Sequence, residues 1–191
     1  MTKINIDKKE SNEEDLTLIE LIKKGDEAAA RKLIMKHKDK VKNLIFITIG
    51  NSIESDDISQ EVFISAFKYL NNFRGDSAFS TWLYRIAINK CKDYVRKNRF
   101  RNKIELNEQN IPYSRNSDEN DFGSKREILR RIINKLPETL KIPLILRDVE
   151  GLSYKEIAEL LNMELSAVKS RIFRARETLK ILIEPYLKEI R

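Results

Sequence analysis

The sequence is poor in the residues from which metal centres and many catalytic sites are built. It contains one histidine and one cysteine among 191 residues. A single cysteine cannot form an intramolecular disulfide, and with one histidine it cannot supply the nitrogen and sulfur ligands of a typical zinc site. No glycine-rich phosphate-binding loop is found. The composition therefore argues against an enzyme, and we expect neither a cofactor nor a metal.

Glycine, proline and long apolar runs are scarce as well. The chain has 5 glycines and 4 prolines, and its longest apolar run, LIFITIG after Asn43, is too short to span a bilayer. The N-terminal stretch MTKINIDKKESNEED lacks the apolar core of a signal peptide. Apolar residues recur at helical spacing and strand alternation is hard to find, which predicts an all-α fold. We expect a soluble, cytoplasmic protein.

Positive charge is what the sequence has in excess. Lysine and arginine number 37 against 30 aspartate and glutamate residues, for a net charge of +7. Such a balance favours an anionic partner, either nucleic acid or a membrane surface, without choosing between the two.

Helical periodicity is interrupted once along the chain, which predicts two helical domains. Residues 11–101 are expected to form the first domain and residues 125–188 the second. The stretch between them, 102–124, is polar, mostly acidic and without a sustained period, and it contains Pro112 and Gly123. This composition is typical of a flexible linker.

Four helices are expected in the first domain. The first opens at Ser11, with Glu14 completing a capping box. The others run over about 26–49, 55–70 and 81–99. His37 lies on the inward side of the second helix, which favours a packed core residue over a catalytic base or metal ligand.

The stretch SYKEIAELLNMELSAVKSRIFRAR near the C-terminus predicts a helix-turn-helix. Ser153 and Glu156 form a capping box for its first helix, and Ser166 can cap the second. The second helix has an apolar face made of Val168, Ile172, Ala175 and Leu179.

Polar and basic side chains lie away from that apolar face. They are Lys169, Ser170, Arg171, Arg174 and Arg176. A capped helix, a tight turn and a basic second helix together favour insertion into a DNA major groove. The alternative is a solvated basic helix in an ordinary bundle.

Two further helical faces stand out in the first domain. The outer side of the third helix is acidic and partly apolar, with Asp57, Gln60, Glu61, Ile64 and Lys68. On this evidence alone, an ordinary solvated surface is the favoured interpretation. The outer side of the fourth helix is a basic stripe with an embedded amide, made of Arg85, Asn89, Lys92 and Arg96. That stripe suits a phosphate backbone and one base edge.

The loop before the fourth helix carries Phe73, Arg74 and Phe79, and Trp82 follows. Aromatic rings beside a basic stripe suit unstacked bases, because every base offers a π-face. The alternative is that Phe79 and Trp82 are core residues that cover the end of the helix.

At these residues the chain resembles the extracytoplasmic-function group of bacterial sigma factors. The resemblance rests on DDISQEVFISAF, FRGDSAFSTWLYRIAINK and EGLSYKEIAELLNMELSAVKSRIFRARE. It implies two helical domains, called sigma two and sigma four, that bind core RNA polymerase and direct it to promoters. It also implies contacts with the beta-prime coiled coil and the beta subunit, a monomer when free, and possible inhibition by an anti-sigma factor.

The resemblance assigns roles to individual residues. Asp57, Gln60, Glu61 and Phe63 match the segment that docks on the beta-prime coiled coil. Phe73, Arg74 and the following loop match the segment that captures a flipped base of the minus-ten element, supported by Tyr84, Arg85, Asn89 and Lys92. Lys169, Ser170 and Arg174 match the residues that read the minus-thirty-five element. The tandem tryptophans of housekeeping sigma factors are absent, with Arg85 and Ile86 at the aligned positions, so strand opening is expected to be weaker and promoter choice stricter.

Two other classes share the C-terminal motif. A helix-turn-helix recombinase would need an α/β catalytic domain with a nucleophilic serine, and no strands are found for one. An ordinary transcriptional regulator would need a sensor or dimerisation domain, whereas the N-terminal half here carries its own basic stripe. A regulator would bind DNA without core polymerase, a recombinase would cut DNA, and a sigma factor would program a run-off transcript.

Overall fold

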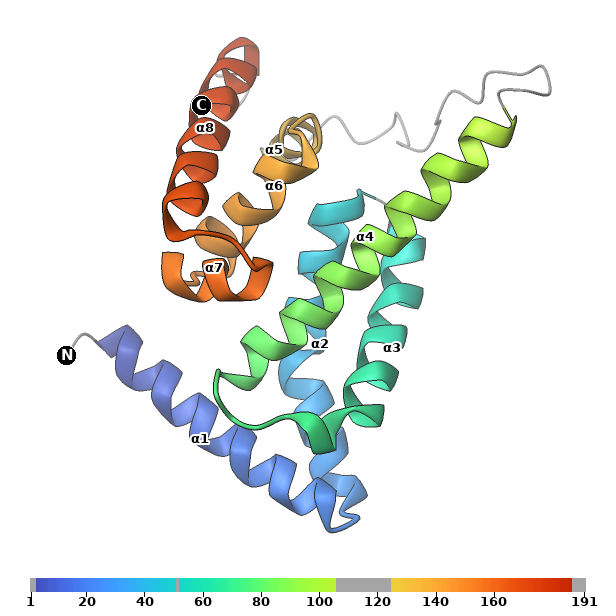
Figure 1. Cartoon of the computed structure of the whole chain (residues 1–191), viewed down its shortest axis with the longest axis vertical. Helices are drawn as coiled ribbons and strands as arrows, with labels where there is room; N and C mark the ends of the chain where they lie inside the picture. Colours follow the sequence, from blue (N-terminus) through green and yellow to red (C-terminus); the bar gives the residue numbers. More distant parts are fainter. Residues whose placement is uncertain (1–2, 51, 106–124, 187–191) are drawn as a thin grey trace.

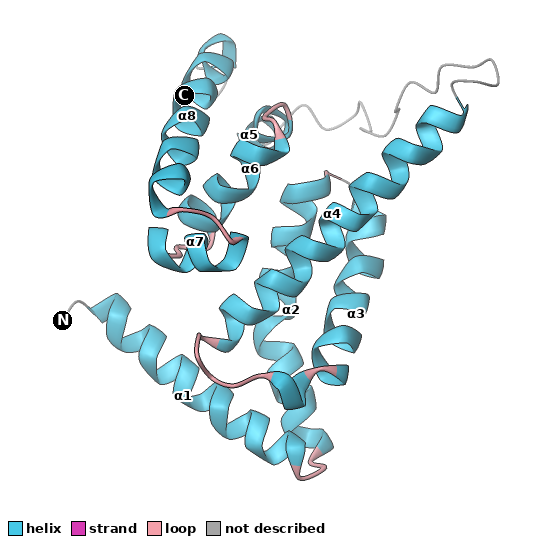
Figure 2. Cartoon of the chain, viewed as in Figure 1, coloured by secondary structure: helices cyan, strands magenta, loops and turns pink. Residues whose placement is uncertain are grey.

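The chain folds as a bundle of α-helices. The computed structural model describes residues 3–50, 52–105 and 125–186, and all regular structure within those ranges is helical (Figure 1 and Figure 2). The N-terminal half contains α1 (Lys3–Lys23), α2 (Glu27–Ile49), α3 (Ser52–Lys68) and α4 (Phe79–Glu105). The C-terminal half contains α5 (Lys125–Asn134), α6 (Glu138–Leu144), α7 (Tyr154–Leu161) and α8 (Leu165–Ile183). The all-α prediction is confirmed.

Helix α2 begins and ends where its sequence predicts. The Asp26 carboxylate accepts hydrogen bonds from the backbone N–H groups of Ala28 and Ala29, at 2.8 and 3.0 Å. These bonds satisfy two of the donors that a helix N-terminus leaves free. The helix ends at Gly50, which adopts a left-handed φ of 77° that glycine reaches without a Cβ clash.

Other helix limits differ from the prediction, including those of α3, which runs over Ser52–Lys68 instead of about 55–70. Helix α1 runs through Ser11, so the predicted capping box of Ser11 and Glu14 is wrong; the Glu14 carboxylate instead accepts from Lys36 Nζ at 2.7 Å. Helix α4 continues past residue 101 to Glu105. The rest of the predicted linker, 106–124, lies outside the described residues.

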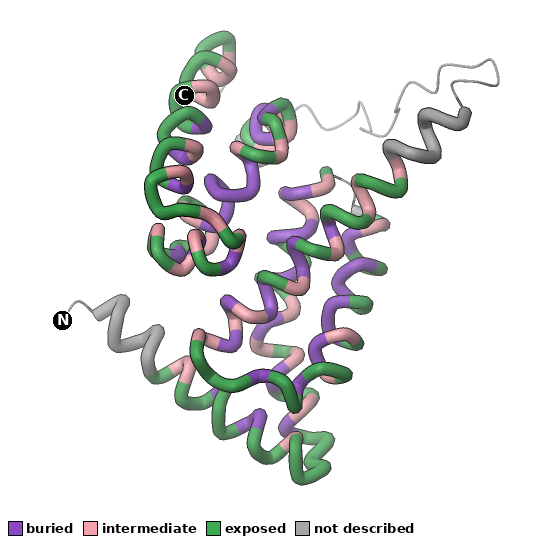
Figure 3. Tube along the Cα trace, in the orientation of Figure 1, coloured by how far each residue is buried: buried purple, intermediate pink, exposed green. Residues whose placement is uncertain are grey.

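The N-terminal core forms where α2, α3 and α4 face one another (Figure 3). Its fully covered side chains include Leu33, Val41, Leu44, Val62, Leu83 and Ala87. His37 is 4% exposed, which confirms it as a core residue. Its Nε2 lies 3.0 Å from the buried carboxylate of Asp15 on α1, a partner that the sequence did not indicate.

The C-terminal half packs around α6, whose residues from Lys141 onward are buried (Figure 3). Val168, Ile172 and Ala175 of α8 are buried, as their spacing predicts. The apolar core also continues between the two halves, because Ile142 and Ile157 belong to the same buried cluster as Leu44 and Leu83.

Candidate nucleic-acid interfaces

Helices α7 and α8 form the predicted helix-turn-helix. The Ser153 hydroxyl accepts from the Glu156 N–H at 3.2 Å, and the Glu156 carboxylate accepts from the Ser153 N–H at 2.7 Å, which confirms the capping box. The tight turn is made by Asn162, which adopts a left-handed φ of 52°. The predicted cap at Ser166 is wrong: α8 already begins at Leu165, and no side chain caps it.

The outward face of α8 presents Ser170, Phe173 and Arg174, all exposed. This face lies opposite the buried Val168 and Ile172, as the helical spacing predicts. Phe173 is 66% exposed and was missed, although its position three residues after Ser170 and next to Arg174 could have revealed it. A serine, a phenyl ring and an arginine on one face can contact base edges and a thymine methyl group.

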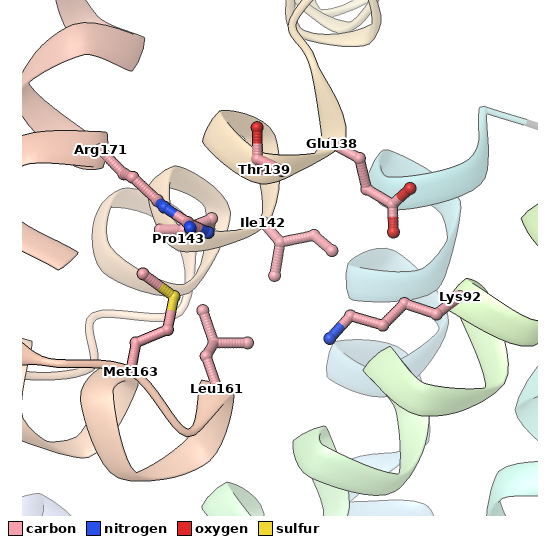
Figure 4. A pocket seen from close by; sticks show the side chains of 8 residues that line it. All are labelled: Lys92, Glu138, Thr139, Ile142, Pro143, Leu161, Met163 and Arg171. Carbon is pink, nitrogen blue, oxygen red and sulfur yellow. The ribbon is translucent and has the colours of Figure 1, made fainter. Parts of the chain in front are cut away.

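The flanks of α8 are less uniform than its outward face. Arg176 forms two hydrogen bonds with the Asp148 carboxylate, at 2.6 and 3.0 Å, so it fastens α8 to the turn before α7. Arg171 points from the other flank into a pocket of about 280 Å³, across which Lys92 of α4 projects (Figure 4). Lys169 is exposed.

The basic stripe of α4 is on the surface. Arg85, Asn89, Lys92 and Arg96 are all exposed. Arg85 donates to the backbone carbonyl of Glu159 on α7 at 3.2 Å, and Arg96 pairs with Asp93 at 2.9 Å. The C-terminal half therefore lies against part of this stripe.

The aromatic residues beside the stripe are mostly internal, which corrects the prediction. Phe73 is 6% exposed and packs edge-on against Phe79, with ring centroids 5.6 Å apart. Trp82 is half-buried, and its ring centroid lies 5.3 Å from that of Phe73. Arg74, in contrast, is exposed. The ring of Phe73 therefore offers no free face to a base in this conformation.

Tyr84 is also buried, at 3% exposure, instead of lying on the DNA-facing surface. Its hydroxyl donates to the Glu150 carboxylate at 2.5 Å. Burial and the adjacent carboxylate both raise the pKa of Tyr84. Burial likewise raises the pKa of Glu150, although the hydrogen bond from Tyr84 opposes that shift.

The outer face of α3 presents Asp57, Gln60, Glu61 and Ile64, all exposed. Glu61 pairs with Lys90 of α4 at 2.9 Å. Phe63 is 9% exposed and belongs to the core, so it supports this face from behind instead of lying on it. Ile53 was missed: it is 75% exposed, and its position four residues before Asp57 places it on the same side.

Neither a metal centre nor a membrane span emerges from the part of the chain that the structure describes. Within it no cluster of three or more His, Cys, Asp or Glu side chains could hold a metal ion. No helix there is both long enough and apolar enough to cross a bilayer.

A helix-turn-helix with an exposed polar and basic face, joined to a helical half with a basic stripe, is typical of a DNA-binding protein. Comparison with known protein families identifies the family. Residues 33–101 match the model for sigma-70 region 2, and residues 126–179 match the model for sigma-70 region 4. The chain belongs to the extracytoplasmic-function group of RNA polymerase sigma factors.

Individual relatives agree with this assignment. The RNA polymerase sigma-H factor of Pseudomonas aeruginosa is 38% identical over 194 residues, covering 94% of this chain and 98% of that protein. The ECF RNA polymerase sigma-E factor of Escherichia coli K12 is 36% identical over 191 residues, covering 91% of this chain and 96% of that protein. The chain is therefore a non-enzymatic factor for promoter-specific transcription initiation.

Solved structures share the fold. The sigma factor RpoE of Bartonella quintana, in complex with the anti-sigma factor NepR, matches with a TM-score of 0.69 and 19% identity over 81% of this chain and 96% of that one. CnrH, in complex with the cytosolic domain of CnrY, matches with a TM-score of 0.68 and 25% identity, over 90% of this chain and 98% of that one.

Proposed function

We propose that three surfaces of this sigma factor have separate binding roles in promoter recognition. The outer face of α3 binds core RNA polymerase, the basic stripe of α4 binds the minus-ten element, and the outward face of α8 reads the minus-thirty-five element. The observation that carries the proposal is that these three faces are exposed, separate and chemically distinct, and lie in the segments that match sigma-70 regions 2 and 4.

Arg174 and Ser170 supply the base contacts of α8 in this proposal. The Arg174 side chain projects opposite the buried face of the helix and has no partner among the described residues. An arginine so placed can donate two hydrogen bonds to the O6 and N7 atoms of a guanine. Lys169 and Arg171 on the flanks contact phosphates, whose binding is independent of sequence.

On α4, Asn89 is the candidate for a base edge, because an asparagine amide both donates and accepts hydrogen bonds. It is exposed between the cations Arg85 and Lys92. Those two side chains bind the backbone of the opened strand. Arg74 lies on the loop before α4 and is free to join them.

On α3, Asp57 and Gln60 supply polar contacts, and two exposed isoleucines, Ile53 and Ile64, supply the apolar ones. Ile53 is 75% and Ile64 is 67% exposed. Large apolar side chains among acidic ones suit a protein partner with basic and apolar groups, here the beta-prime coiled coil.

We also propose an anti-sigma factor as a regulatory partner and the cytoplasm, where RNA polymerase acts, as the site of action. The support for the partner is that a similar solved structure is a sigma factor in complex with the anti-sigma factor NepR, and that a second, CnrH, is in complex with the cytosolic domain of CnrY.

Permanganate footprinting of the holoenzyme on a cognate promoter tests the minus-ten assignment. Asn89→Ala and Arg74→Ala are expected to reduce the reactivity of unpaired thymines while the holoenzyme still binds the duplex. Met35→Ala, at an exposed residue of α2, is the matched control. Normal opening by both variants at saturating protein would contradict the assignment of this surface.

A further inference from the structure

The pocket in Figure 4 has a cation on each of two opposite sides. Lys92 reaches into it from α4 and Arg171 from α8, so each half of the molecule supplies one of the two. The pocket has a volume of about 280 Å³. Ligand pockets in proteins begin at roughly 300 Å³, so this one suits a small molecule.

The two cations of the pocket differ from others on the same helices because they are unpaired. Among the described residues, neither side chain forms an ion pair or a hydrogen bond. On α4, by contrast, Lys90 pairs with Glu61 at 2.9 Å. On α8, Arg176 pairs with Asp148 at 2.6 Å. Arg171 is half-buried, and a cation that has lost part of its hydration is stabilised by an anion that binds beside it.

The surface between the cations is mostly apolar. It is formed by Ile142 and Pro143 of α6, Leu161 at the end of α7 and Met163 in the turn that follows. A flat ring can lie on such a surface, and a methionine sulfur makes favourable contacts with an aromatic ring. An inorganic anion would leave this surface uncovered, so the pocket favours an anion that carries a ring.

A carboxylate and a cation face the pocket together at one end. Glu138, in the first turn of α6, is half-buried, and its carboxylate lies on the side of Lys92 (Figure 4). The described structure contains no ion pair between the two. The carboxylate accepts hydrogen bonds and the ammonium group donates them. Side by side, they match a ring that presents an amino group next to a ring nitrogen, as adenine does.

We propose that this pocket binds an adenine nucleotide, with adenosine monophosphate as its simplest form. Arg171 binds the phosphate at one end of the pocket, and the base lies over Leu161 and Met163. At the other end Glu138 accepts from the amino group of the base and Lys92 donates to a ring nitrogen. The ligand competes with DNA for the two cations. The site itself lies beyond the proposed function and does not rest on it.

Calorimetric titration of the free chain with three probes tests the ligand class. The probes are adenosine monophosphate, inosine monophosphate, which has a carbonyl oxygen in place of the amino group, and inorganic phosphate. The adenine nucleotide is expected to bind about tenfold more tightly than either of the others, because only it fits both ends of the pocket. Equal binding of the two nucleotides, equal binding of phosphate, or no binding of the adenine nucleotide would overturn the proposal.

Variants at the two ends of the pocket test the orientation of the ligand. Arg171→Gln is expected to weaken binding of adenosine monophosphate about tenfold through loss of a charged donor. Lys180→Gln, the same change at an exposed residue of α8, is the control and should bind as the wild-type chain does. Glu138→Gln should abolish the preference over inosine monophosphate, because an amide can donate as well as accept. Folded Arg171→Gln that binds as tightly as Lys180→Gln would overturn the site.

The methionines report where the base lies. The sequence contains three, of which Met163 lines the pocket and Met35 is 62% exposed on α2. In the chain with carbon-13-labelled methionine methyl groups, the ring current of a bound adenine should shift the Met163 resonance and leave that of Met35 in place. Inorganic phosphate should shift neither resonance. Adenosine monophosphate that binds without moving the Met163 resonance would lie outside this pocket and overturn the proposal.

Discussion

Asp15 is the most deeply buried acidic side chain among those that the structure describes, at 2% exposure. It lies between two side chains of α2, with Lys36 Nζ at 2.7 Å and His37 Nε2 at 3.0 Å. Burial opposes its ionisation, but the hydrogen bonds from His37 and Lys36 outweigh burial and hold the pKa of Asp15 below its usual value. This carboxylate therefore ties α1 to α2.

We predict that Asp15→Ala lowers the free energy of unfolding by about 3 kcal/mol at pH 7, because it leaves buried donors without their acceptor. Since the folded-state pKa is depressed, the stabilisation is present above the unfolded-state pKa and is lost as pH falls through the folded-state pKa. Urea unfolding at several pH values measures both effects. Asp39→Ala, at an exposed acid of α2, is the control. A difference that does not shrink in acid would contradict an ionised Asp15.

Arg174 and Arg176 are two residues apart on α8 but have different surroundings. Arg174 points outward, whereas Arg176 is held by Asp148. We predict that Arg174→Ala relaxes sequence preference at one or two minus-thirty-five base pairs, by about 1 to 3 kcal/mol of discrimination. Arg176→Ala should weaken binding to all sequences alike, because it releases α8 from Asp148 but leaves the outward side chains of α8 in place. Holoenzyme binding to promoters varied only at that element distinguishes the two, and a uniform loss for Arg174→Ala would contradict its place on the reading face.

At the scale of a single element, the capping box of α7 sets the geometry of the helix-turn-helix. We predict that Ser153→Ala lowers the free energy of unfolding by about 1 kcal/mol, because the Glu156 N–H loses its acceptor. Ser166→Ala is the matched control, since Ser166 is exposed and does not cap α8. Chemical denaturation measures both variants. Equal losses for the two serines would argue against a distinct capping role for Ser153.

Helix α3 carries the proposed polymerase-binding face. We predict that Asp57→Lys weakens binding to core polymerase about tenfold without changing stability, because Asp57 is exposed on the outer side of the helix. Glu61 is a less clean test, since Glu61→Lys would place two cations where Glu61 now pairs with Lys90. Asp39→Lys on α2 serves as the control. Unchanged co-elution of folded Asp57→Lys with core polymerase would contradict the assignment.

The predictions made from the sequence are correct mainly for features that depend on residues close together along the chain. The capping box at Ser153, the buried face of α8 and the exposed stripe of α4 all follow from spacings within one helix. The predicted cap at Ser11 fails because the residues before it are helical as well, so Ser11 lies inside α1 and not at its start. Tyr84 and Phe73 were misplaced because their burial depends on Glu150 and Phe79, which spacing within α4 does not bring to them.

At the scale of the whole molecule, the two halves share one apolar core and are joined by polar bonds at their boundary. The sequence indicates two domains but cannot show that they meet. The basic excess, a net charge of +7, suits the proposed binding of DNA.

The most direct test of the central claim is run-off transcription with core polymerase on a promoter selected from a randomised library. The account predicts a transcript that requires the chain. At limiting protein, Asp57→Lys should reduce the transcript about tenfold through weaker polymerase binding, and Arg174→Ala should make it less dependent on the minus-thirty-five sequence. Asp39→Lys should transcribe as the wild-type chain does. A folded chain that binds the selected promoter but yields no transcript above core polymerase alone would contradict the account.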